Sequence, residues 1–176
     1  LVHPPQSPPP NYLGCSAFDE ARGESIHLLP TIPLEGWRWN GTTWAQLPGS
    51  MPPDGAGKHL VYDVARQRVV YIAQRLVSGN NIQDVWEWNG VVWQQQLPPS
   101  SPPGRDVPSV AYDRSRGVTV MFGGGQPDDT WEWNGQTWAH PTPSIRPPGR
   151  EQAVMSFDPN TQRILLYGGF NSVQRF

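Results

Sequence analysis

The sequence predicts an all-β protein built from repeated units of four short antiparallel strands. Three observations predict it. An octapeptide with three tryptophans occurs three times, and a second pattern occurs four times between and around those copies. In addition, no stretch shows the spacing of apolar residues that a helix requires. The 21 prolines and 18 glycines among 176 residues also disfavour long helices.

The octapeptide contains all nine tryptophans of the chain and spans residues 37–44, 86–93 and 131–138. Each copy includes Asn-Gly, which favours a two-residue type I′ turn between antiparallel strands. Such a turn places Trp37 opposite Trp44 and Trp39 opposite Thr42. Because residues two apart share a face of a strand, the three tryptophans of each copy are expected on one face.

That tryptophan face is expected to be buried. Each tryptophan offers about 150–250 Å² for burial, and three on an exposed face would form a large apolar patch. A carbohydrate-stacking platform is the alternative, but a ligand site rarely needs three copies. Arg38, Glu87 and Glu132 alternate with the tryptophans, so they are expected on the opposite face.

The second pattern is an aromatic residue followed by Asp, a polar loop and an apolar run. Its copies begin at Phe18-Asp19, Tyr62-Asp63, Tyr112-Asp113 and Phe157-Asp158. Together with the β-prone residues before it, each copy predicts a hairpin.

One unit is therefore this hairpin followed by a tryptophan hairpin, and proline-rich links separate the units because proline cannot donate to a ladder. The predicted organisation is a proline-rich lead-in (1–13), three complete units (14–47, 58–97 and 108–140) and a half unit (152–170), all in one domain.

These repeats resemble the kelch-repeat β-propeller family, especially its bacterial members. The features that carry the resemblance are Gly123-Gly124 and Gly168-Gly169 after the second strand, the spacing of Trp131 and Trp138, and an arginine before the first strand at Arg105 and Arg150. The first two units depart from the pattern, because other residues replace the glycine pair there. The resemblance implies four-stranded blades around a channel, and an extracellular or bacterial-envelope location.

The predicted fold class is thus an all-β, kelch-like β-propeller fragment of about three and a half blades. Kelch propellers typically close with six or seven blades, so the resemblance implies an open arc with unpaired edges. Two copies supply 28 strands, the number in seven blades, which leads to the hypothesis of a homodimer that completes a propeller. The alternative is a piece of a longer protein.

Composition narrows the range of partners. The net charge of −2 gives no indication of nucleic-acid binding. The sequence contains no run of 18 apolar residues, so no membrane span is predicted. The single Cys15 allows no internal disulfide. No HExxH, GxSxG, P-loop or CxxC motif is present, so the sequence favours a binding module over an enzyme.

Residues that break the repeat are the candidates for a site. His27 and His59 are candidate metal ligands, although a histidine satisfied within the fold is the more ordinary interpretation of each. By resemblance, the first strand of each unit lines the channel, so His59 and Lys58 are expected near it, and Lys58 is a candidate ligand-binding residue. Arg105 and Arg150 are candidate ligand-binding residues, since a guanidinium binds carboxylates in a fork. Packing or a surface ion pair is the alternative for both.

Two further features remain open. The segment from Gln74 to Asp84 is longer than its counterparts and is interpreted as a long loop that either carries function or is a tolerated insertion. Asp84 and the Asp128-Asp129 pair precede tryptophan hairpins. These aspartates are interpreted either as ligands of a cation or as solvated residues at the end of a loop.

The leading functional hypothesis is a binding or scaffold module that recognises a protein, peptide, glycan or small molecule at the channel mouth. The alternative is a zinc-dependent hydrolase of esters or phosphoesters, with histidines converging at a homodimer centre. No cofactor is certain, and zinc is the candidate. A third possibility is a structural part of a larger envelope protein.

Overall fold

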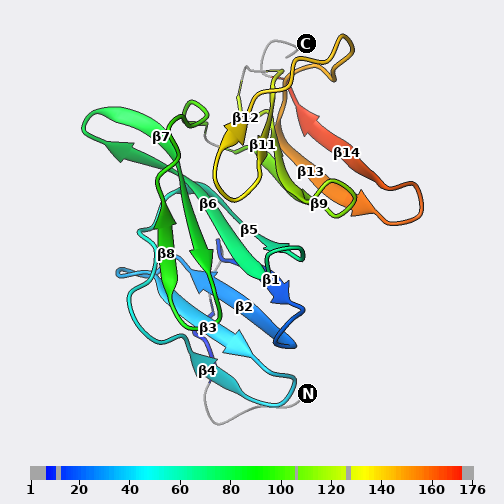
Figure 1. Cartoon of the computed structure of the whole chain (residues 1–176). Coiled ribbons are helices and arrows are strands. Elements are labelled where there is room, and N and C mark those ends of the chain that lie inside the picture. Colours follow the sequence, from blue (N-terminus) through cyan, green and yellow to red (C-terminus); the bar gives the residue numbers. More distant parts are fainter. Residues whose placement is uncertain (1–6, 11–12, 106, 126–127, 172–176) are drawn as a thin grey trace.

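A computed structural model of the chain describes residues 7–10, 13–105, 107–125 and 128–171. These residues form strands without a helix (Figure 1), so no described segment could cross a membrane as a helix.

Blade 1 contains β1 (Cys15–Asp19), β2 (Glu24–Leu29), β3 (Glu35–Trp39) and β4 (Trp44–Gln46). Blade 2 contains β5 (Ala56–Asp63), β6 (Arg68–Val77), β7 (Asn80–Trp88) and β8 (Trp93–Gln96). Blade 3 contains β9 (Ser109–Asp113), β10 (Val118–Phe122), β11 (Thr130–Trp133) and β12 (Trp138–Ala139). Blade 4 contains β13 (Glu151–Asp158) and β14 (Arg163–Phe170).

Each of the first three blades is an antiparallel sheet whose strands follow chain order, and β13 pairs with β14 in a two-stranded sheet. The prediction of four-stranded units followed by a half unit is therefore confirmed. The strands of blade 2 begin at Ala56, two residues before the predicted boundary. Most of the predicted lead-in, 1–13, lies outside the described residues.

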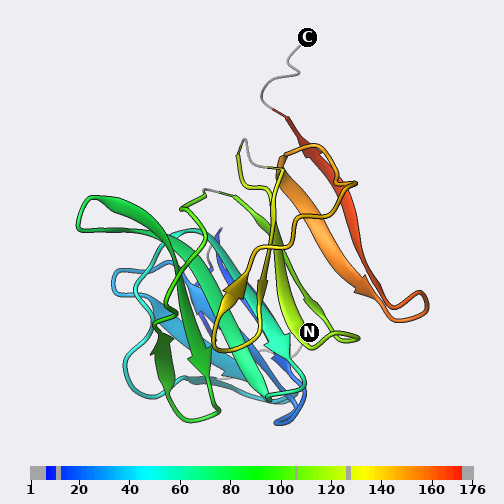
Figure 2. The same cartoon turned by 45° about the horizontal axis from the view of Figure 1, so that its top comes forward.

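The four sheets stand side by side in an open arc, from β1–β4 at one end to β13–β14 at the other (Figures 1 and 2). The first strands of successive blades contact one another, β1 with β5, β5 with β9 and β9 with β13. The half blade thus takes its own position in the arc, so each chain occupies four blade positions. Two copies would occupy eight positions, although their 28 strands equal the number in seven complete blades. The predicted total of seven blades therefore does not follow from the strand count.

The core lies between blades. One apolar cluster joins the face of blade 1 opposite its tryptophans to Trp88 and Trp93 of blade 2. A second cluster joins Val70 and Ile72 of blade 2 to Trp133 of blade 3. Each tryptophan face therefore packs against the preceding blade. The prediction that the tryptophans are core residues holds wherever the chain supplies that blade.

The register of the tryptophan hairpins differs from the prediction. Trp39 pairs with Trp44, not with Thr42, and Trp37 pairs with Gln46. The rings of Trp39 and Trp44 lie 5.2 Å apart, and the other two hairpins repeat this pair. Because Trp37 and Trp39 are two apart on one strand, the three tryptophans still share a face.

The asparagine side chain explains the difference in register. Asn40 accepts hydrogen bonds at Oδ1 from the backbone N–H of Thr42 (3.0 Å) and Thr43 (2.8 Å). This Asx turn stabilises a four-residue loop, in which Gly41 has positive φ and the asparagine does not. A type I′ turn needs positive φ at both central residues.

A two-residue turn of the predicted kind occurs elsewhere, at Ser78 and Gly79. Both have positive φ, and Val77 pairs with Asn80 across the turn. The segment from Gln74 to Asp84, interpreted above as a long loop, is thus an extension of the β6–β7 hairpin. This prediction was wrong because backbone pairing continues past the point where the apolar pattern ends.

Candidate binding surfaces

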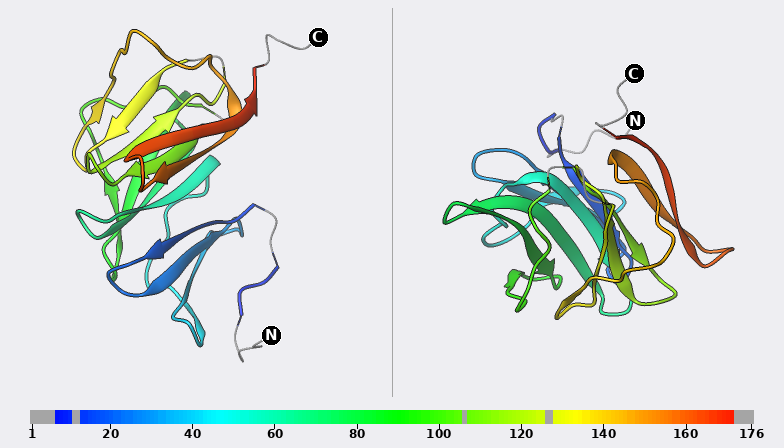
Figure 3. Two further views of the ribbon diagram at one scale, coloured as in Figure 1. Left: turned by 90° about the vertical axis from the view of Figure 1, so that its right-hand side faces the viewer. Right: turned by 90° about the horizontal axis from the view of Figure 1, so that it is seen from above.

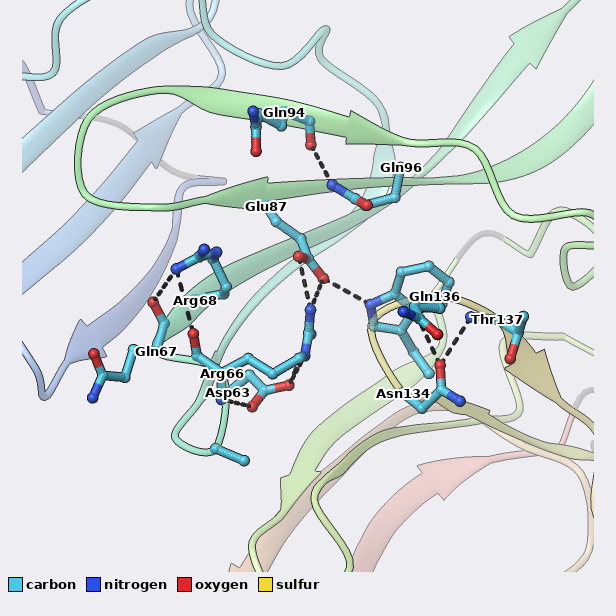
Figure 4. Close-up of polar contacts among 12 residues, drawn as sticks. Asp63, Arg66, Gln67, Arg68, Glu87, Gln94, Gln96, Asn134, Gln136 and Thr137 are labelled. Atoms are coloured by element: carbon cyan, nitrogen blue, oxygen red, sulfur yellow. Dashed lines mark hydrogen bonds and ion pairs between the residues drawn. The ribbon is translucent and has the colours of Figure 1, made fainter.

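Charged side chains join blade 2 to blade 3. In blade 2, Arg66 donates to Asp63 (2.8 Å) and to Glu87 (2.7 and 2.8 Å), as Figure 4 shows. Glu87 also accepts a hydrogen bond from the indole Nε1 of Trp133, in blade 3, at 3.0 Å. The acid that alternates with the tryptophans therefore faces the next blade and binds its indole, which the sequence pattern alone did not reveal.

The blade 1 counterpart of Glu87 is Arg38, which cannot accept a hydrogen bond. The buried Nε1 of Trp88, the counterpart of Trp133, accordingly has no partner among the described residues. Arg38 instead forms an ion pair with Glu24 at 3.5 Å. The junction between blades 1 and 2 is therefore less completely hydrogen-bonded at this point than the next one.

Tyrosine hydroxyls make a second repeated connection. The hydroxyl of Tyr62 accepts from the backbone N–H of Ala21 (3.0 Å), and that of Tyr112 accepts from Ala65 (3.3 Å). Each bond links the first strand of a blade to the preceding blade. Phe18 has the same position in blade 1, which no described blade precedes, and it is 54% exposed.

Arginine also explains the glycines of the tryptophan hairpins. A Cβ at Gly135 would overlap the guanidinium of Arg66, and a Cβ at Gly90 would overlap that of Arg22. The turn of one blade is therefore covered by an arginine of the preceding blade. Gly41 has positive φ as well, but no atom of the described residues lies within 4 Å of a Cβ placed there, so no described arginine covers its turn.

Arg105, a predicted ligand-binding residue, is a buried structural residue. Its guanidinium pairs with Asp129 in a fork (2.6 and 3.2 Å) and donates to the carbonyls of Gly123 (3.0 Å) and Pro103 (3.3 Å). The side chain is 1% exposed. Its donors are used within blade 3, so the packing alternative fits this placement better than ligand binding does.

Asp129 is thus neither a solvated loop end nor an empty cation site. Burial alone would raise its pKa, but hydrogen bonds from Arg105 and Trp131 outweigh burial and hold the pKa below its usual value. Asp84 repeats the arrangement in blade 2, where it accepts from Arg75 (2.6 Å) and Trp86 (2.9 Å). The cation interpretation of these aspartates is therefore wrong.

Arg150 has the same position in blade 4, but only half of the partners. It donates to the carbonyls of Pro148 (3.2 Å) and Gly168 (3.0 Å), as Arg105 does to their counterparts. No acid of the described residues forms an ion pair with it, because these residues include no blade 4 counterpart of the hairpin that carries Asp129. Of the two predicted arginines, Arg150 is the one with capacity to bind a carboxylate.

Lys58 and His59 lie where the first strands begin, beside a hollow of about 620 Å³ at one mouth of the arc. The Lys58 ammonium forms an ion pair with Asp54 at 2.9 Å. His59 is half-buried, faces blade 3 and bonds to the carbonyl of Pro108; burial lowers its pKa and that bond opposes the change only partly. Both residues line this hollow, and each already has a partner, so their role as channel residues stays a prediction.

His27 lies elsewhere, on the tryptophan face of blade 1. Its ring meets the edge of Trp44 at 4.8 Å, and burial lowers its pKa. Since His59 faces blade 3, the two histidines do not converge within one chain. Across the described ranges, no three His, Cys, Asp or Glu side chains gather as a metal site would require. A zinc centre shared by two chains stays a prediction, which metal analysis of untagged protein would test.

The two ends of the arc are uncovered faces. Leu165 and Tyr167 of blade 4 are 55% and 81% exposed, whereas their counterparts in blade 3, Val120 and Phe122, are 5% and 3% exposed. The exposed Val154 lies beside Tyr167 on the same face. We call Val154, Leu165 and Tyr167 the C-terminal end face. This face could have been found by aligning the four repeats, because its residues match residues that are buried in blade 3.

At the other end, no blade of the described structure covers the tryptophan face of blade 1. Phe18, His27, Trp39 and Trp44 share this face, by the pairing of β1 to β4, and we call them the N-terminal end face. Trp39 and Trp44 are half-buried, whereas the equivalent residues of blades 2 and 3 are buried. Figure 3 shows the blades that carry the two faces at opposite ends of the arc.

Comparison with solved structures identifies this arrangement. One similar structure is described as YCF48 bound to D1 peptide, with 17% identity, a TM-score of 0.50, and coverage of 83% of this chain and 43% of that chain. The fold is that of a β-propeller. A second, described as the structure of YjhT, has 10% identity, a TM-score of 0.48, and coverage of 94% of this chain and 74% of that chain.

The propeller chain spans less than half the length of YCF48. No protein-family model matches the sequence, and the search of curated proteins found no significant match. Membership of the kelch family therefore remains a prediction. The likeness extends to the fold, and propellers of one fold serve many functions.

Proposed function

We propose that this propeller chain is a protein-binding scaffold whose binding surfaces are the two end faces of the arc. The observation that carries the proposal is the contrast between equivalent residues. Inside the arc, the counterparts of Leu165 and Tyr167 are buried by the next blade, whereas these two residues are exposed. An apolar face of this kind is typical of a protein interface.

The partner that fits both faces is a second copy of the chain. Each interior junction already joins a tryptophan face to a face equivalent to that of Leu165 and Tyr167. A head-to-tail contact between copies would repeat this junction, with Phe18 in the place of Tyr62. Because such a contact joins unlike surfaces, two copies close a ring only if the rotation between them allows it. The proposed assembly is a homodimer, in an extracellular or envelope location.

Two variants, one at each end, test the head-to-tail contact. Phe18→Glu and Tyr167→Glu each place a charge on one end face, so each variant alone is expected to sediment as a single chain. An equal mixture is expected to form a two-chain species, since the intact face of one variant matches the intact face of the other. Ile145→Glu, at a site 89% exposed in a link, is the control and should associate like the unchanged protein.

The opposite results would remove the proposal. If both variants associate as strongly as the control, the end faces are not the interface. If the mixture stays single-chain although the control associates, the contact is not head-to-tail.

The channel mouth is the proposed site for a peptide ligand. YCF48 is described as bound to a peptide, and in this chain the mouth hollow is lined by Gly55, Gly57, Lys58 and His59. Glycines leave backbone groups accessible to an extended peptide. Peptides selected on the chain from a random phage-displayed library are expected to lose binding on Lys58→Glu and to keep it on the link variant Ile145→Glu. Retained binding on both would place the site elsewhere.

A further inference from the structure

We propose that the free edge of β14, together with three side chains beside it, is a receptor for a β-hairpin with the pattern acid-x-Trp-Glu-Trp-Asn-Gly. Docking of such a hairpin would complete blade 4. This inference concerns the edge of the blade, so it stands independently of the association proposed for its face.

The edge itself is the first observation. In blades 1 to 3, the second strand of each blade pairs on both sides, with the first strand and with the tryptophan hairpin. β14 pairs with β13 alone among the described residues, although it is eight residues long. An unpaired strand presents a row of backbone donors and acceptors, which a further strand can satisfy.

Arg150 is the second observation. Its counterpart Arg105 holds Asp129, the acid two residues before the first tryptophan of the blade 3 hairpin. Arg150 makes the same two carbonyl contacts but pairs with no acid of the residues that the structure describes, and a hollow of about 340 Å³ lies beside it. The acid of a docked hairpin would occupy this position and complete the fork.

Glu132 and Arg116 are the third observation. In blade 2, Glu87 binds an indole of the next hairpin, and the side chains of Arg66 and Glu87 are 29% and 7% exposed. In blade 3, Arg116 and Glu132 form the same pair, but they are 49% and 18% exposed and no indole reaches Glu132 in the described structure.

The three groups would meet three parts of one hairpin. Arg150 fits the acid, Glu132 fits the indole of the second tryptophan, and Arg116 fits over the glycine of the turn, as Arg66 does over Gly135. The register follows from blade 3, where Thr119 pairs with the second tryptophan of its hairpin, so Ile164 would pair with it in blade 4. The chain's own repeats therefore specify the occupant.

A synthetic peptide with the sequence of residues 128–140, DDTWEWNGQTWAH, is the probe. Calorimetric titration into the full chain is expected to show saturable binding of one peptide per chain. Changing the peptide at the positions of Asp129 to Asn, or of Trp133 to Phe, removes one charge-assisted hydrogen bond and is expected to weaken binding about tenfold. Arg150→Ala in the chain should weaken it similarly, whereas Arg146→Ala, at an exposed surface arginine, should not.

An isolated hairpin is marginally stable, so a tethered form provides a second measurement. The same sequence, attached after Phe176 by a Gly-Ser linker, is expected to raise Tm by several degrees and to protect β14 amides from hydrogen exchange. A tethered copy with the Asn and Phe changes is the matched control. Equal behaviour of the two tethered forms, or peptide binding that ignores both peptide changes and Arg150→Ala, would overturn the proposal.

The Phe18→Glu chain separates this proposal from the association of copies. It should bind the peptide as strongly as the unchanged chain, because Phe18 lies on blade 1. Peptide binding without association of the unchanged chain would leave the hairpin receptor standing and remove the proposed interface. Association without peptide binding would do the reverse.

Discussion

Trp133→Ala is expected to lower the free energy of unfolding by about 3–5 kcal/mol. Trp133 is fully buried between blades 2 and 3, and its Nε1 is one of the partners of the buried Glu87. The change leaves a cavity and an acid with one bond fewer. Trp39→Ala is the matched control, since Trp39 has the same place in blade 1 but lies on the uncovered end face. Its expected cost is about 1 kcal/mol, measured by urea unfolding of both variants.

Equal losses for the two tryptophans would contradict this account. That result would mean that the N-terminal end face is covered as completely as the interior junctions are. Measuring at low protein concentration is essential, because association would cover Trp39 and raise its cost. A rise of the Trp39→Ala cost with concentration would itself support the proposed interface.

Gly123→Ala is expected to destabilise the chain by about 3 kcal/mol. Gly123 has φ +67°, which costs about 1–2 kcal/mol for a residue with a Cβ, and that Cβ would also overlap the carbonyl oxygen of Arg150 in blade 4. Gly168→Ala is the control at the equivalent position of blade 4. Its φ is +70°, but no atom of the described part of the chain lies within 4 Å of the added Cβ, so it should cost only the backbone part.

The difference between the two glycine variants measures the close approach of blades 3 and 4, and thermal unfolding of both would provide it. If Gly168→Ala costs as much as Gly123→Ala, another element covers blade 4 in solution. If both cost less than 1 kcal/mol, blades 3 and 4 do not pack as closely as the structure shows.

The repeats made the fold predictable because periodic patterns report strands and faces directly. The alternation of tryptophans with Arg38, Glu87 and Glu132 correctly separated two faces of each hairpin. The register was not predictable from the Asn-Gly dipeptide, because the asparagine side chain competes for the turn's backbone N–H groups. Local sequence identifies a turn more reliably than it fixes the number of residues in it.

The site was predicted less well, because it depends on contacts between distant residues. Arg105 and Arg150 are indistinguishable in sequence, each following Pro-Pro-Gly. Their difference comes from Asp129, which has no counterpart in the described part of blade 4. The exposure of Leu165 and Tyr167 likewise arises because no described blade follows blade 4 in the arc. Aligning the four repeats reveals these positions, and only the structure shows which are left uncovered.

The mass of the unchanged chain in solution, measured by light scattering over a range of concentrations, is the most direct test of the central claim. The claim is that both ends of the arc are interaction surfaces that a second copy covers. It predicts a mass of twice 19.7 kDa. A mass of 19.7 kDa at every concentration would contradict it.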